Sequence, residues 1–310
     1  MSRRRAAQPG AGPRSRDEAR LTVNVLIPSI AFGLISASVL AIAAVGFTLQ
    51  FAVTNVLNLA YSAVMIASAF VAYAVNRQGV TIWVAALAAA AAGAALSLFL
   101  NRVIYTPFQR RKASPIAIVI VALGMTLIIE YGTQAIAGPT NVSYAMGQGA
   151  TLAIGTFRLT VAQLAIIVLS IVLMLGVHVL MRYTRLGKAM RATAANRDLA
   201  RNSGIRTDRV VSATWLVSGA LCGLAGAVFA MDAGTFGATS TDLFLVLILA
   251  AVFLGGPGEP YGAMLGAVVI GLGTEVSAAF IVSDYKDVVA FVVLLAMLAV
   301  RPNGLLGARA

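Results

Sequence analysis

Long apolar stretches constrain the fold of this chain more than any other feature of its sequence. Nine of them lie at about 22–50, 53–76, 80–104, 114–137, 160–181, 210–231, 241–256, 262–282 and 286–301. Most reach the roughly 17–25 residues that an α-helix needs to cross about 30 Å of hydrocarbon. Because backbone groups in lipid must hydrogen-bond within their own segment, we expect these stretches to be helices. The sequence therefore predicts an all-α integral membrane protein, a polytopic helical bundle.

Composition and charge placement support this fold class and give it an orientation. Hydrophobic residues make up 60% of the 310 residues and charged residues 11%, whereas soluble domains carry about a quarter charged residues. The net charge of +12 is gathered in a few segments, so it indicates topology and a cytoplasmic partner surface rather than nucleic acid. By the positive-inside rule, segments 101–113 and 182–209 face the cytoplasm, and segments 138–160 and 231–242 face outside.

The N-terminal segment and the number of crossings are linked. Residues 1–20, rich in Arg, Gly and Pro, are predicted to be a disordered cytoplasmic tail, followed by a transmembrane permease domain over 21–310. Because segment 101–113 is also predicted to be cytoplasmic, a cytoplasmic tail requires an even number of membrane crossings before residue 101. Three apolar stretches precede that residue. We therefore expect 53–76, which Asn55 and Asn58 interrupt, to be broken or re-entrant, giving about eight transmembrane helices. An external N-terminus would instead give nine.

The sequence contains few groups that could perform chemistry. No P-loop pattern occurs, so any ATP must be hydrolysed by another subunit, and we predict a chain with no enzymatic activity and no metal site. The single cysteine, Cys222, and the single histidine, His178, are interpreted as packing or interfacial residues. Glycines at helical spacing indicate close helix packing. They are Gly219, Gly223 and Gly226 in one stretch, and Gly262, Gly266 and Gly273 in another.

Only two acidic residues fall well inside apolar stretches, which is a poor apparatus for proton or sodium coupling. Glu130 is either intramembrane or solvated near the external interface. Glu275 should point into the bundle, where two roles are open: a structural bond to a neighbouring helix, which we favour, or a polar group at the edge of a solute path.

The basic segment 182–209 is the most informative. Its Ala-rich start favours a helix, Gly204 is placed to end that helix, and its charges exclude it from lipid. Such a helix suits docking in a groove of another protein. The alternative is an ordinary positive-inside loop.

At this segment the sequence shows a resemblance to a known family. TRLGKAMRATAANRDLARNSGIRTDRVV (184–211) resembles the cytoplasmic loop of permeases in branched-chain amino acid ABC transporters. AVGFTLQFAVTNVLNLA (44–60), RVIYTPFQRRKAS (102–114) and the segment 253–307, which begins FLGGPGEPYG, match in the same order. The resemblance covers roughly 22–307.

The resemblance implies a complex of two permease chains, this one and a homologous or identical second, with two cytoplasmic ATP-binding subunits and an external solute-binding protein. ATP and Mg²⁺ would be used by the ATPases, and this chain would need no cofactor. Membrane lipid and a small-molecule substrate, a branched-chain or related amino acid, complete the partners. The protein would be a multi-pass protein of the bacterial inner membrane, importing its solute by alternating access.

The resemblance also suggests functional residues. Segment 191–204 would be the coupling helix that docks on the ATPase, with Arg191, Ala194, Ala195, Asn196, Asp198 and Gly204 as its candidate residues. The substrate pathway would include Asn55, Asn58, Tyr61, Ser62, Thr274 and Glu275, with Tyr61 one helical turn after Asn58 on the same face. Tyr61 and Ser62 stand where the family usually has His and Gly. The identity of the solute therefore stays undecided, since related permeases import amides and urea. The alternative function is a self-sufficient channel or secondary transporter for urea, amides or amino acids.

Overall fold

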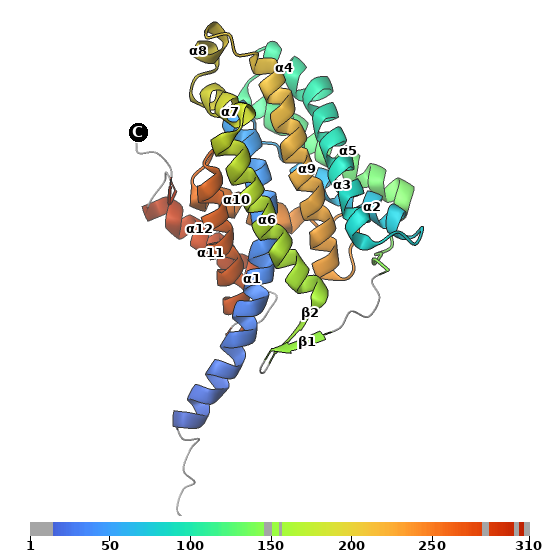
Figure 1. The fold of residues 1–310 in the computed structure, drawn as a ribbon, viewed down its shortest axis with the longest axis vertical. Helices are drawn as coiled ribbons and strands as arrows, with labels where there is room; N and C mark the ends of the chain where they lie inside the picture. The colour runs from blue at the N-terminus through green and yellow to red at the C-terminus, as the bar shows by residue number, and fades with distance from the viewer. Residues whose placement is uncertain (1–14, 146–150, 155–156, 281–284, 301–303, 307–310) are drawn as a thin grey trace, which may run out of the picture.

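The computed structural model describes residues 15–145, 151–154, 157–280, 285–300 and 304–306, and nearly all of them are helical (Figure 1). The helices are α1 Ser15–Thr54, α2 Tyr61–Asn76, α3 Ile82–Leu100, the π-helical turn η1 Asn101–Tyr105, α4 Thr106–Arg110, α5 Pro115–Ala137, α6 Val161–Tyr183, α7 Arg185–Ala195, α8 Arg197–Asn202, α9 Thr207–Ala233, α10 Asp242–Gly255, α11 Pro260–Ala278 and α12 Lys286–Val300. Two strands, β1 Thr151–Ile154 and β2 Phe157–Thr160, form an antiparallel hairpin with Thr151 opposite Thr160.

The helix lengths confirm a polytopic membrane bundle. Within the described residues, six helical segments are long and apolar enough to cross a membrane, and two shorter apolar helices, α2 and α10, lie among them. The predicted interruption of the second apolar stretch is confirmed, because α1 runs on to Thr54 and α2 begins only at Tyr61. The residues between them are not helical.

The two ends of the bundle differ as the charge placement predicted. Helices α4, α7 and α8 lie together at one end, which we call the basic end, and the β1–β2 hairpin lies at the other (Figure 1). Helix α1 starts at the hairpin end (Figure 1), inside the segment predicted to be a tail; residues 1–14 lie outside the described residues. After α12 the chain is held at the opposite end, where the Leu305 N–H donates to the Leu254 carbonyl at 2.8 Å. The six long and two shorter apolar helices of the described part agree with the expectation of about eight transmembrane helices.

Glycines allow the central helices to approach closely, as the spacing predicted. A Cβ at Gly93 of α3 would overlap the backbone of Gly219 and Gly223 in α9, and one at Gly266 would overlap the Ala251 carbonyl of α10. The second predicted stripe is wrong at one position. Gly273 faces open space, and Gly271 packs against Ala37 of α1 instead. Small residues thus position α1 and α9 at the centre of the bundle.

The loops at the hairpin end, which are predicted to be external, contact one another and α2. Val142 and Phe236 pair through two backbone hydrogen bonds of 2.9 Å, which join the loop after α5 to the loop after α9. The Tyr144 hydroxyl donates to the Ala69 carbonyl at 3.0 Å, and burial raises the pKa of this phenol, so it stays a neutral donor. The Thr241 hydroxyl donates to the Ser62 carbonyl at 3.0 Å. The second loop therefore reaches the start of α2.

Candidate functional site

The break between α1 and α2 brings polar side chains into the bundle. Asn55 takes a positive φ of 51°, which ends α1, and the chain stays non-helical until Tyr61. Asn58 lies within this break and is only 1% exposed. The prediction that Tyr61 follows Asn58 on the same helical face is therefore wrong, because the two residues are not in one helix. Because of the break, the side chains of Asn58 and Tyr61 contact different partners.

Six buried residues form what we call the Asn58 cluster: Gln50, Asn58, Tyr61, Tyr105, Trp215 and Ser218, none more than 1% exposed. The Tyr105 hydroxyl donates to Asn58 Oδ1 at 2.6 Å, and the Tyr105 ring packs on Trp215 with centroids 5.0 Å apart. The Ser218 hydroxyl donates to Gln50 Oε1 at 3.3 Å, while the Tyr61 hydroxyl donates to the Ser218 carbonyl at 3.5 Å. Contacts between α1, the break, η1 and α9 thus hold an uncharged polar site in the interior.

Several polar groups in and near the Asn58 cluster have no hydrogen-bond partner. Gln50 Nε2, Asn58 Nδ2 and Trp215 Nε1 are buried without a partner, as are the hydroxyls of the neighbouring Thr48 and Ser62. Unpartnered buried polar groups are rare in proteins and call for an explanation such as a ligand. Three N–H donors without acceptors suit a ligand that carries carbonyl or carboxylate oxygens. Among the described residues, no group of three His, Cys, Asp or Glu could hold a metal ion.

Thr274 and Glu275 lie apart from this cluster. The Thr274 hydroxyl donates to carbonyls of its own helix, Ile270 at 3.0 Å and Gly271 at 3.1 Å, and Glu275 Oε1 accepts from the Ser36 hydroxyl at 3.2 Å. The preceding turn of α11 packs on Ala37 of α1. Gln50 lies thirteen residues further along α1, or about 20 Å at 1.5 Å per residue. The predicted pathway residues therefore form two separate groups.

The sequence allowed two positions for Glu130 and predicted a packing or interfacial role for His178. The structure buries Glu130 of α5, which is 4% exposed, against Asp242 in the first turn of α10, so it is not a solvated surface residue. His178 Nδ1 lies 2.9 Å from the Tyr261 hydroxyl, a hydrogen bond between α6 and α11. His178 is therefore an interfacial residue, as predicted.

The coupling segment is two helices rather than one. Asn196 is extended, with φ −158°, and separates α7 from α8; its Oδ1 accepts from the Leu199 N–H at 2.9 Å and so begins α8. The prediction of one helix over 191–204 is wrong at this residue, because an N-cap asparagine starts a new helix. Gly204 has a positive φ of 84° just after α8, as predicted. Exposed positions include Arg191, Ala194, Ala195, Asn196 and Asp198.

A cavity of about 1,380 Å³ lies at the basic end, between the end of α1, α6, α7 and the turn before α11. Asn55 lines it together with Arg191, Ala194 and Ala195 of α7. Arg182, Glu259 and His178 add charged and titratable groups to its wall. The cavity thus joins one predicted pathway residue to three predicted coupling residues, which sequence spacing could not show.

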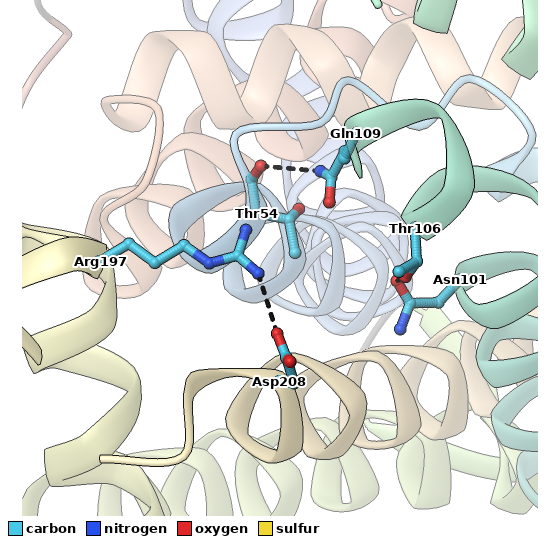
Figure 2. A network of polar contacts seen from close by, with 6 residues as sticks. All are labelled: Thr54, Asn101, Thr106, Gln109, Arg197 and Asp208. Carbon is cyan, nitrogen blue, oxygen red and sulfur yellow. Dashed lines mark hydrogen bonds and ion pairs between the residues drawn. The ribbon is translucent and has the colours of Figure 1, made fainter. Parts of the chain in front are cut away.

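A second, basic pocket of about 470 Å³ lies between α8, α9 and the η1–α4 segment. Figure 2 shows Arg197 of α8 paired with Asp208 of α9 at 3.4 Å. It also shows the Gln109 side chain donating to the Thr54 carbonyl at 3.4 Å, which ties α4 to the end of α1. The Thr106 hydroxyl donates to Asn101 Oδ1 at 3.3 Å. Sequence analysis missed this pocket, although three of its arginines lie within 102–111.

Sequence analysis also missed four members of the Asn58 cluster, namely Gln50, Tyr105, Trp215 and Ser218. Gln50 carried a usable signal, because a glutamine inside an apolar stretch is unusual. Tyr105 and Trp215 carried none, since their stacking depends on how η1 meets α9.

Comparison with known proteins gives consistent matches over most of the chain. The family described as "Branched-chain amino acid transport system / permease component" matches residues 29–298. The high-affinity branched-chain amino acid transport system permease protein LivH of Escherichia coli is 28% identical, covering 89% of this chain and 93% of its own. BraD of Pseudomonas aeruginosa, with the same description, is 27% identical over 89% and 94%. A probable LivH of Methanocaldococcus jannaschii is 27% identical over 88% and 90%. No solved structure matches the chain.

Proposed function

The chain belongs to the branched-chain amino acid transport permease family, and from this premise we propose that it is the membrane subunit of an ATP-driven importer for branched-chain or related amino acids. It is a multi-pass plasma-membrane protein with six long and two shorter apolar helices in its described part. The single observation that carries the proposal is the family match over residues 29–298.

The energy source must lie in other chains of the complex. The sequence has no P-loop, so the proposal assigns ATP and Mg²⁺ to two partner ATP-binding subunits. A second permease chain, homologous or identical, and an external solute-binding protein complete the importer. This chain then serves as a conduit, and its own residues need only bind the solute weakly and switch between two states.

Helices α7 and α8 are suited to couple ATP hydrolysis to that switch. They lie at the basic end, and α7 shares the 1,380 Å³ cavity with Asn55, the first residue of the break. A shift of α7 would therefore act on the segment that carries Asn58. A ligand or partner can switch a protein only through contacts that differ between its states. The α7–Asn55 cavity provides a place for such contacts.

The Asn58 cluster is the proposed polar part of the pathway. Its unpartnered N–H groups would donate hydrogen bonds to the carboxylate oxygens of an amino acid, and its lack of formal charge avoids holding a zwitterion too tightly. All six residues are buried, so the pathway is closed here, and the cavity at Asn55 is its mouth on the basic side.

We test the proposal on the assembled complex in liposomes with the Ala194→Trp variant. Ala194 is exposed and lines the α7 cavity, so a large side chain there should obstruct docking or closure without touching the lipid-facing spans. We expect substrate-stimulated ATP hydrolysis to fall at least about tenfold, a loss of about 1.4 kcal/mol of coupling. The matched control is Ala137→Trp, an exposed position at the end of α5.

Two results would contradict the proposal. Normal stimulated hydrolysis by Ala194→Trp would remove α7 from the coupling path. Uptake by the chain alone, without ATPase subunits, would favour the channel or secondary transporter.

A further inference from the structure

The basic pocket has an unbalanced charge. Four arginines line it, Arg102, Arg110, Arg111 and Arg197, against one acid, Asp208. Its other lining residues are Asn101, Thr106, Pro107, Gln109, Val211 and Ser212. Asp208 pairs with Arg197, so three cationic side chains of the pocket are left without a carboxylate within the pocket. A pocket of this kind favours an anion with several oxygen acceptors.

The surroundings of the pocket indicate which anion. On the continuous α3–η1–α4 run, Phe99 is 54% exposed and Val103 is 51% exposed, directly beside Arg102. Exposed apolar side chains on a membrane-spanning helix face hydrocarbon, and basic residues at the same helix end mark the headgroup level. Phe99 and Val103 thus flank Arg102, which lines the pocket, and they offer an apolar surface for the acyl chains of a lipid whose headgroup occupies it.

We propose that this pocket binds the phosphate headgroup of an anionic phospholipid from the leaflet at the basic end. Basic pockets between membrane helices on the cytoplasmic side are suited to such headgroups. A docking acidic segment of a partner protein would match the arginines as well, but it would leave the apolar flank of Phe99 and Val103 unused. A free phosphate would leave it unused too.

Occupation of the pocket would join two parts of the importer. Arg102 and Arg110 belong to the η1–α4 segment, which holds the Thr54 carbonyl through Gln109, whereas Arg197 belongs to α8 of the coupling segment. A phosphate in contact with both sides would bridge them and would compete with Asp208 for Arg197 (Figure 2). The lipid would thus connect the coupling helices to the break that carries Asn58.

The test measures phosphatidylglycerol binding to the purified full chain by native mass spectrometry, with phosphatidylcholine as the neutral lipid. Each basic residue near a lipid surface contributes about fivefold to the affinity for an anionic lipid. We expect the Arg102→Gln, Arg110→Gln double variant to lose on the order of 25-fold in phosphatidylglycerol affinity. Phosphatidylcholine binding should not change. The control Arg209→Gln removes a charge from the same turn of α9 outside the pocket and should keep the wild-type affinity.

A variant that is expected to bind the lipid more tightly distinguishes a specific effect on the pocket from misfolding. The Asp208→Asn variant removes the one acid of the pocket and should bind phosphatidylglycerol about fivefold more tightly. Asp198→Asn removes an exposed acid of α8 outside the pocket and should not.

Three results would overturn the proposal. An equal loss per removed charge in the double variant and in Arg209→Gln would reduce the effect to net charge. Displacement of the lipid by millimolar inorganic phosphate would make the site one for a soluble anion. Unchanged lipid binding by the double variant, together with loss of the ATPase subunits when the same variant is purified as the assembled complex, would assign the pocket to a protein partner.

Discussion

Two regions of the bundle share a predicted role but differ in how their polar groups are satisfied. Around Asn58 the helix is broken, the residues are uncharged, and three N–H donors have no acceptor. Around Thr274 and Glu275 the helix is continuous, the hydroxyl donates to its own backbone, and the carboxylate accepts from Ser36. Both regions face the interior of one bundle.

The difference separates a polar site that can bind a ligand from polar groups that hold helices together. A buried donor without a partner destabilises a protein by roughly 1–3 kcal/mol. The Asn58 cluster carries three such donors, so its arrangement is not explained by stability. The hydrogen bond of Glu275 to Ser36 has a structural role, since it joins α11 to α1. The Asn58 cluster is therefore the better candidate for the solute path.

The largest expected effect comes from Asn58→Leu. This change removes the unpartnered Nδ2, and with it a hydrogen bond to the solute worth up to about 1.5 kcal/mol. We expect uptake per assembled complex to fall about tenfold. The measurement is ATP-driven uptake in proteoliposomes, normalised to the amount of intact complex.

Tyr105→Phe is the matched control for that experiment. It removes the same Tyr105–Asn58 hydrogen bond from the other side but leaves the Asn58 amide in place. If Asn58 matters only as a structural partner of Tyr105, the two variants will lose uptake equally. If the amide serves the solute, Tyr105→Phe will transport far better than Asn58→Leu.

A medium effect on the free energy of unfolding is expected from replacing a threonine by valine, and its sign should differ between the two regions. Thr48 is fully buried with an unpartnered hydroxyl, so Thr48→Val should raise the free energy of unfolding by about 1 kcal/mol. The hydroxyl of Thr274 donates to its own helix, so Thr274→Val should lower the free energy of unfolding by about 0.5 kcal/mol. Thermal unfolding of the purified variants decides this. A loss of stability in both would erase the contrast.

The sequence was sufficient for the bundle and for its two ends. Apolar length predicted the helices, and clustered arginines placed 101–113 and 182–209 together at one end, as Figure 1 shows. Both signals act within one segment, so no knowledge of packing is needed. The break at Asn55 was also predicted, because several polar residues interrupt one apolar stretch.

The sequence failed where function depends on which segments meet. The Asn58 cluster joins Gln50, Tyr105 and Ser218, which are far apart along the chain. Their meeting involves two close approaches to α9, that of α3 at Gly219 and Gly223 and that of α1 at Gly46. The division of the coupling segment at Asn196 was missed for a local reason. An asparagine within a helical pattern reads as a weak helix former, but here its side chain caps the next helix.

The smallest effect is expected from Glu275→Gln, which tests the other side of the comparison. Glutamine keeps the length of the side chain and an oxygen that can accept from the Ser36 hydroxyl, so the link between α11 and α1 should survive. The variant should assemble normally and transport at near wild-type rates between about pH 5.5 and 8, because a structural hydrogen bond needs an acceptor but not a charge. Ser36→Ala is the companion variant; it removes the donor, and an interhelical bond in a membrane is worth only about 0.6 kcal/mol on average. A small loss of stability with normal uptake is therefore expected from Ser36→Ala. If an intact Glu275→Gln complex instead loses most of its transport, the negative charge itself takes part in moving the solute, and the two regions belong to one pathway after all.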